Sequence, residues 1–201
     1  TLADTVDVIV ANASATYAVS ASDTINTLTV GAAGKAQLDS GQTLTIAATS
    51  AIAGIVQGTG NLSITGGTTT LSAVNTYEGT TTIANGATLL IDGSGQLDSG
   101  SYAGAIANAG TLDYDSSATQ TLSGIISGAG ALTITGSGTG ALTLTGANTY
   151  TGNTTITTGS LVIGGAGKLG NGSNVYAGAI ANDTTLTYSS SATQTLSGAI
   201  S

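Results

Sequence analysis

Seven residue types are missing from the sequence, and one of them is Arg. None of the 201 residues is Cys, His, Pro, Met, Trp or Phe. The absence of Cys excludes disulfides, thiolate metal sites and thiol redox chemistry. The absence of His removes the side chain that most often exchanges protons near neutral pH, so general acid–base catalysis has few candidates left. From these absences we predict no catalytic residue, no metal site and no cofactor.

Positive charge is nearly missing as well. Lys35 and Lys168 are the only basic residues, and the formal net charge is −8. A protein that binds nucleic acid needs several Lys or Arg side chains on one face, so we expect no nucleic-acid partner. No apolar run approaches the roughly 20 residues that a membrane helix requires, and we expect no direct membrane insertion by this segment.

What the sequence does contain is repetition. "YAGAIAN" occurs at 102–108 and again at 176–182, and "SSATQTLSG" occurs at 116–124 and 190–198. A weaker upstream copy is indicated by "QLDSG", which occurs both at 37–41 and at 96–100. Long repeats of this kind are typical of solenoids, in which several coils make up one unit. We predict a single domain with internal units 1–53 (degenerate), 54–127 and 128–201.

Within each unit, apolar and hydroxyl side chains alternate. "NLSIT" (61–65), "ALTIT" (131–135) and "ALTLT" (141–145) place Leu or Ile on one side and Thr or Ser on the other. A period of two predicts β-strands, and Gly-rich segments between the strands predict tight corners. No stretch has the period of an amphipathic helix. Disorder is disfavoured because 40% of the residues are hydrophobic and lie in alternation.

The repetition decides between all-β architectures. A sandwich or a barrel gives its strands no reason to recur, whereas a parallel β-helix stacks similar coils. We therefore predict an all-β, parallel β-helix (β-solenoid) of roughly nine coils. Its expected core ladder comprises Leu132, Ile134, Leu142, Leu144, Ile156, Leu161 and Ile163. The expected structural corners of successive units comprise Asn75, Tyr77 and Gly79, and Asn148, Tyr150 and Gly152.

Four recurring tyrosines allow two interpretations. Tyr77, Tyr102, Tyr150 and Tyr176 could form an aromatic stripe for adhesion, or they could pack between coils. We favour packing, because residues that recur in every unit of a solenoid usually serve its structure.

Few acidic residues are candidates for chemistry. Asp113 and Asp115 flank Tyr114 and come closest to a carboxylate pair, but we expect them on a solvated strand face. Asp92 and Asp98 faintly resemble ligands of a calcium loop. The second unit lacks both carboxylates, which excludes a metal site shared by every repeat and leaves a single weak Ca²⁺ site as the alternative.

The chain ends in the middle of a pattern. Its last residues, "SATQTLSGAIS", match 117–127, where the earlier copy continues into "GAGALTITG". No cap for the last coil is recognisable. We expect either that a longer chain continues the stack or that another subunit does.

One segment carries a family resemblance. Residues 128–165, "GAGALTITGSGTGALTLTGANTYTGNTTITTGSLVIGG", resemble the autotransporter-associated β-strand repeat of bacterial autotransporter passenger domains. The features that carry the resemblance are "LTITG", "LTLTG", the corner "ANTYTGNTTI" and the closing "GSLVIG". The resemblance implies a right-handed parallel β-helix that a Gram-negative-type cell exports and displays on its outer surface or outside the cell.

The expected function is structural. We predict a cell-surface or extracellular β-solenoid that serves as a passenger stalk or forms fibres by end-to-end stacking, as a homo-oligomer or as part of a longer chain. One alternative is an adhesin that binds host or surface glycans through its Thr/Asn/Tyr-rich flank. A β-helical carbohydrate-active enzyme is disfavoured, because neither Arg nor His is present to stabilise charge or move protons.

Overall fold

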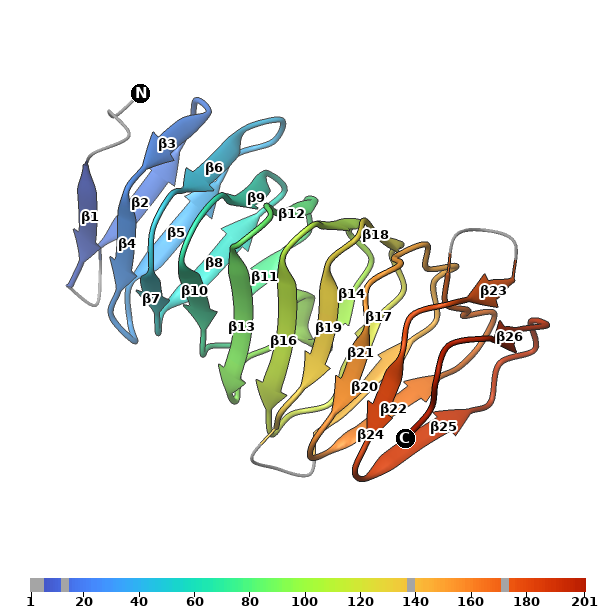
Figure 1. Cartoon of the computed structure of the whole chain (residues 1–201). Coiled ribbons are helices and arrows are strands. Elements are labelled where there is room, and N and C mark those ends of the chain that lie inside the picture. The colour runs from blue at the N-terminus through green and yellow to red at the C-terminus, as the bar shows by residue number, and fades with distance from the viewer. Residues whose placement is uncertain (1–5, 12–14, 137–139, 171–173) are drawn as a thin grey trace.

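The computed structural model describes residues 6–11, 15–136, 140–170 and 174–201. These residues form 26 short β-strands and one 3-10 turn at Asp98–Gly100. The strands wind into about nine coils that stack from the first coil (blue) to the last (red), with the two termini at opposite ends (Figure 1). The predicted all-β parallel solenoid is confirmed.

Each coil contributes strands to three faces of the stack. Face 1 is a nine-stranded sheet, and it consists of β1 (Asp7–Val10), β4 (Thr27–Val30), β7 (Ser50–Ile52), β10 (Thr68–Leu71), β13 (Thr88–Gly93), β16 (Thr111–Ser116), β19 (Ala131–Ile134), β21 (Thr154–Ile156) and β24 (Ile180–Asn182). Every described pair of neighbouring strands on this face is parallel.

Faces 2 and 3 are each divided into two sheets. Face 2 consists of β2 (Thr16–Val19), β5 (Lys35–Leu38), β8 (Ile55–Gly58) and β11 (Thr76–Tyr77), followed by β14 (Ser101–Tyr102), β17 (Gln120–Leu122), β20 (Ala141–Leu144), β22 (Ser160–Ile163) and β25 (Thr185–Tyr188). Face 3 consists of β3 (Asp23–Ile25), β6 (Thr43–Ile46), β9 (Asn61–Ile64), β12 (Thr81–Ile83), β15 (Ile106–Asn108) and β18 (Ile126–Ser127), followed by β23 (Val175–Tyr176) and β26 (Thr195–Leu196).

The alternation of residues explains the strands. In β9, β19 and β20 the Leu and Ile side chains are buried, while the intervening Asn, Ser, Ala and Thr are partly exposed. Branched Thr and Ile suit this pleated, half-buried surface. Each fully buried Leu or Ile contributes on the order of 1.5 to 3 kcal/mol, so a stack of such coils is stable without large aromatic side chains.

Equivalent residues of successive repeat units do not lie on the same face of the stack. On face 3 the successive partners are Leu62, Thr81, Ile106 and Ile126. Three coils therefore take 64 residues, whereas the sequence copies "YAGAIAN" begin 74 residues apart, at 102 and 176. The repeat is ten residues longer than these three coils, and the ten residues add one strand, so the next unit begins one face further around the stack. As a result, Thr81 lies on face 3 and its counterpart Thr154 lies on face 1.

Equivalent side chains of the two repeat units therefore do not lie on one line along the axis. The coils differ in length: 20 residues separate Asp7 from its partner Thr27, and 26 separate Thr154 from Ile180. Each strand pairs with the strands of the neighbouring coils, whatever its place in the repeat unit. The length of one repeat unit therefore need not equal a whole number of coils. The second unit is therefore turned by one face relative to the first.

The shared pentapeptide "QLDSG" also proves to be a poor guide to structure. At 37–41 its first two residues end β5 and the rest form a turn. At 96–100 its last three residues form the 3-10 turn, in which Asp98 and Ser99 have φ angles of 41° and 52°. The same five residues thus adopt two conformations, and the packing around them decides which.

The core runs through the whole stack and is open at both ends. Its buried residues extend from Val10 to Ile180. The partly buried apolar residues that pack against this core all belong to the first and last coils. They are Val8, Ala15 and Tyr17 at one end and Leu186 and Leu196 at the other.

Candidate functional site

Each full unit has a buried Asn at one corner. The Oδ1 atom of Asn75 accepts a hydrogen bond from the Val56 backbone N at 2.9 Å, and that of Asn148 accepts one from the Ile126 N at 2.9 Å. In both cases Nδ2 donates to the carbonyl two residues earlier. The amides replace backbone partners that the corner lacks, and a buried polar group needs such partners.

Two buried tyrosines follow the first of these corners. The Tyr77 hydroxyl lies 2.8 Å from Thr81 Oγ1, which lies 2.8 Å from the Tyr102 hydroxyl. Tyr102 donates its proton to the Gly79 carbonyl, which can only accept. Thr81 must therefore donate to Tyr102, and Tyr77 must donate to Thr81. We call these four residues the first tyrosine cluster.

The second unit repeats this arrangement on another face. Tyr150, Thr154 and Tyr176 are linked by two contacts of 2.8 Å, and Tyr176 donates to the Gly152 carbonyl. The rings of Tyr150 and Tyr176 lie 5.4 Å apart, against 5.5 Å for the first pair. This second tyrosine cluster shows that the contacts depend on neighbouring coils and not on which face they occupy.

The clusters are sealed from solvent. Burial raises the pKa of Tyr77 and Tyr150 well above the usual 10, and it raises the pKa of Tyr102 to about 12. A phenolate would be poorly solvated there, so these hydroxyls remain protonated at physiological pH. The four recurring tyrosines lie in the interior, and they cannot form the aromatic part of an adhesive flank.

The two corner glycines allow close contact between coils. A Cβ at Gly79 would lie 2.0 Å from the Gly60 carbonyl oxygen, and one at Gly152 would lie 2.1 Å from that of Gly130. Such distances are far below van der Waals contact. The chain can turn this tightly above the preceding coil only where a side chain is absent.

The structure places the seven residues of the expected core ladder inside the stack, on more than one face. All are buried: Leu132, Ile134, Leu142, Leu144, Ile156, Leu161 and Ile163. The cavity beside Tyr114 and Leu142 has a volume of only about 10 Å³. A packed interior of this kind supports a structural role.

Sequence reasoning missed a group of polar residues that join the coils. Gln120 Oε1 accepts from the Leu97 N at 2.7 Å, and its Nε2 donates to the Leu97 carbonyl at 3.1 Å. Gln194 brackets Leu169 in the same way, at 2.6 and 3.0 Å. The signal was present, because "SSATQTLSG" keeps this Gln in both copies. Thr81 and Thr154 were missed too, although each follows a repeated Tyr by four residues.

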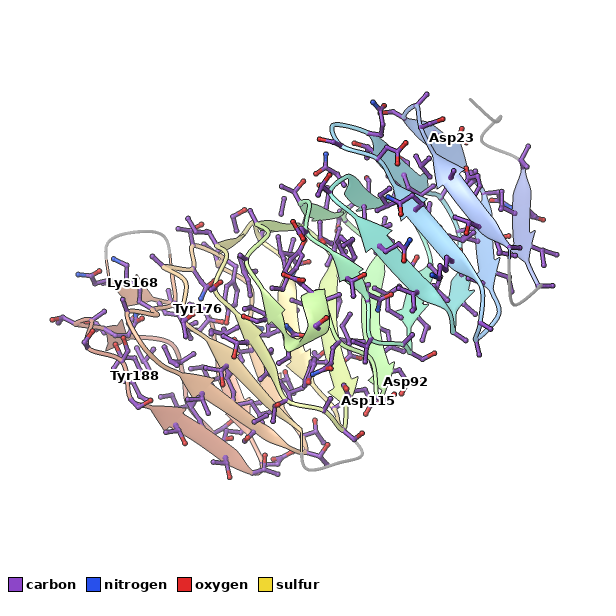
Figure 2. The ribbon with its side chains drawn as sticks, turned by 180° about the vertical axis from the view of Figure 1, so that it is seen from behind. Asp23, Asp92, Asp115, Lys168, Tyr176 and Tyr188 are labelled. Carbon is purple, nitrogen blue, oxygen red and sulfur yellow. The ribbon has the colours of Figure 1, made fainter. Side chains whose placement is uncertain are left out.

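Asp92, Asp113 and Asp115 lie on the partly exposed side of face 1. Asp92 and Asp115 are paired in register on face 1 and lie side by side (Figure 2). Asp92 accepts a hydrogen bond from the Gly93 N at 2.6 Å, and Asp113 accepts one from Thr135 Oγ1 at 2.8 Å. Within the described part of the chain, no three Asp or Glu residues gather into a group that could hold a metal ion.

A shallow groove crosses three neighbouring corners between faces 3 and 1. It is formed by residues 85–88, 109–111 and 129–131 and has a volume of about 380 Å³. Its lining contains Asn, Gly, Ala and Thr but no ionisable side chain. The groove therefore offers hydrogen-bonding groups without a group that could transfer a proton.

The described residues include no helix of the length and apolar character needed to cross a membrane. Two segments of the chain, residues 55–91 and 137–163, match the family passenger-associated-transport-repeat. Together with the β-solenoid, these matches confirm the resemblance to an autotransporter passenger-type repeat. The matched repeat family is not an enzyme family. No curated protein and no solved structure matches the chain.

Proposed function

We propose that this chain, which carries two passenger-associated-transport repeats, is the rigid shaft of a passenger region that a Gram-negative-type bacterium exports to its surface or surroundings. The observation that carries the proposal is the continuous core, whose buried residues run from Val10 to Ile180 and whose cavity beside Tyr114 and Leu142 measures only about 10 Å³. About nine coils at roughly 4.8 Å each make a shaft of about 40 Å. The repeat family supports a surface or secreted location.

The absence of basic and imidazole side chains supports a mechanical role over catalysis. Neither Arg nor His occurs in the sequence, and the groove lining has no ionisable group. A shaft needs only stiffness, which here comes from backbone ladders and packed Leu, Ile and Tyr side chains.

The location can be tested on intact cells of the source organism. Antibodies raised against the purified chain should label the cell surface or detect the protein in the culture fluid. Labelling only after the cells are broken open would overturn the proposal. Limited proteolysis supplies a second criterion, because a continuous parallel ladder should resist cleavage along its whole length.

Adhesion through the flank is the alternative that the experiments must exclude. Burial of the four recurring tyrosines leaves Thr, Ser and Asn side chains as the available contacts. Saturable binding on a glycan array, lost when outward threonines of face 1 such as Thr29 and Thr155 are replaced by Glu, would favour an adhesin over a plain shaft.

A further inference from the structure

Two faces of the stack are interrupted, and both interruptions occur at the same place in the repeat. On face 2 one sheet ends at β11 and the next begins at β14, and on face 3 one sheet ends at β18 and the next begins at β23. Face 1 continues through all nine of its strands. We call the interruption between β11 and β14 the first seam and that between β18 and β23 the second seam.

The tyrosine clusters lie at the seams. Tyr77 of β11 and Tyr102 of β14 pack against each other across the first seam, with ring centres 5.5 Å apart. Tyr150 and Tyr176 of β23 do the same at the second seam. Tyr150 sits directly over β18, because its backbone N donates to the Ile126 carbonyl at 3.1 Å. Side chains therefore join the two edges at the points where the named strands of a face do not pair.

Backbone hydrogen bonds also cross the seams, beside the tyrosines. The Asn75 N donates to the Gln96 carbonyl at 2.9 Å, and the Ser99 N donates to the Asn75 carbonyl at 3.0 Å. At the second seam the Asn148 N donates to the Lys168 carbonyl at 2.9 Å. Ser99 belongs to the 3-10 turn and has a φ of 52°, a conformation that side chains other than glycine disfavour. The first seam thus contains a strained turn in place of a regular strand.

The adjoining faces hold the coils together at each seam. β10 pairs with β13 before the first seam, and β12 pairs with β15 after it. β20 pairs with β22 before the second seam, and β21 pairs with β24 after it. A seam can therefore open on one face while the ladders on both sides of it keep the coils stacked.

We propose that the two seams are joints of the shaft, at which the stack opens locally and bends, and that each tyrosine cluster holds its joint closed. The inference deepens the proposed shaft function and rests on it. Segments with few ladder hydrogen bonds and a strained backbone open at the lowest cost in free energy. The Tyr102 hydroxyl contacts both Thr81 and the Gly79 carbonyl, so both contacts break when residues 96–102 move away from residues 75–79.

The rotation between the units gives the joints different directions. The first seam lies on face 2 and the second on face 3. Opening of the first seam bends the shaft away from face 2, and opening of the second bends it away from face 3. A shaft with this arrangement yields to loads from more than one side, while the uninterrupted sheet of face 1 keeps it in one piece.

Hydrogen exchange, followed amide by amide by NMR on the purified chain, tests the joints. The reporters are the Asn75 and Asn148 amides, which cross the seams. The reference is the Leu132 amide, which donates to the Asn153 carbonyl at 3.0 Å on face 1. Both reporters should exchange at least about tenfold faster than Leu132, because local opening releases them without unfolding the stack. Equal protection of all three amides would overturn the proposal.

Tyrosine variants test what holds the joints closed. Tyr102→Phe should speed exchange of Asn75 about tenfold and leave Asn148 within about twofold, and Tyr176→Phe should do the reverse. If Tyr102→Phe does not fold, Thr81→Val breaks the same chain of hydroxyls. Faster exchange of both reporters and of Leu132 alike would show a general loss of stability, and it would overturn the proposal.

Tyr114→Phe is the matched control. Tyr114 is a tyrosine of face 1 that is only 2% exposed, and its hydroxyl donates to the Ala118 carbonyl at 2.5 Å. The variant loses one buried hydroxyl away from both seams, so neither reporter should change. Faster exchange of Asn75 in this variant would contradict a specific role of the tyrosine clusters. Failure of the joints would leave the shaft function intact, because labelling of intact cells tests that function independently.

Discussion

Residues 54–127 and 128–201 are similar units of the same stack, and their equivalent residues lie on different faces. The tyrosine clusters, the corner Asn residues and the bracketing Gln residues keep the same partners in both units. Yet Thr81 belongs to face 3 and Thr154 to face 1. The comparison shows that each of these contacts joins two neighbouring coils. The face on which it occurs makes no difference.

The two units also differ in burial, because the second unit includes the last coil that the structure describes. There, residues that are buried in the first unit become exposed, as Ile126 and Ile200 show. Identical sequence can therefore belong to the core or to the surface. A substitution in the two counterparts should reveal this difference directly.

The largest effect is expected from a buried charge. Ile126→Asp, like Leu144→Asp, would place an unpaired carboxylate in the core and cost several kcal/mol, which approaches the whole stability of a typical domain. The same change at Ile200 should cost less than about 1 kcal/mol because the side chain is half in solvent. Urea unfolding followed by circular dichroism measures both. Nearly unchanged melting of Leu144→Asp would show that this side chain faces solvent.

A smaller effect is expected at the corners. Gly152→Ala should cost about 3 kcal/mol, since its new Cβ would collide with the Gly130 carbonyl of the coil beneath and the backbone would have to shift. At Gly93 a Cβ meets nothing within 4 Å, and only its φ of 62° is unfavourable, so Gly93→Ala should cost about 1 kcal/mol. Equal losses of unfolding free energy in the two variants would contradict the close approach at Gly152.

The tyrosine clusters test whether the two faces are equivalent. Tyr102→Phe removes the acceptor of the Thr81 hydroxyl proton and the donor to the Gly79 carbonyl, while the contact between Tyr77 and Thr81 remains, and it should cost about 1 to 2 kcal/mol. Tyr176→Phe should cost the same within about 0.5 kcal/mol, because its contacts are the same. Thermal unfolding of both variants provides the comparison. Widely different losses would mean that the face matters after all.

The last effect is a pH dependence, which appears only under alkaline conditions. The pKa of Tyr102 is raised to about 12 in the folded state, so its contribution to stability is complete below pH 10 and is lost as the pH rises from 10 through 12. The loss should be about 1.4 kcal/mol per pH unit in this window. Unfolding free energies of the chain and of Tyr102→Phe, measured side by side at alkaline pH, isolate this slope. Parallel curves would show that Tyr102 does not titrate with a raised pKa.

Much of the fold can be predicted from the sequence, because strand orientation and corners depend on residues that are close together in the chain. Alternation of Leu and Thr in "ALTIT" determines which residues of β19 point inward, and glycine marks the corners. The low number of basic residues and the missing His exclude whole classes of function. Recurrence of the Tyr and Asn corners was also visible, although it left open whether the tyrosines form a surface or a core.

Only the tertiary structure decided how the coils lie on one another. It turned the second unit by one face, gave "QLDSG" two conformations and placed Tyr188 at the surface although its counterpart Tyr114 is buried. The physical reason is that strand pairing joins residues about 20 or more positions apart, and its register depends on the length of every corner between them. Burial then depends on whether another coil lies above, and no residue's own sequence context contains that information.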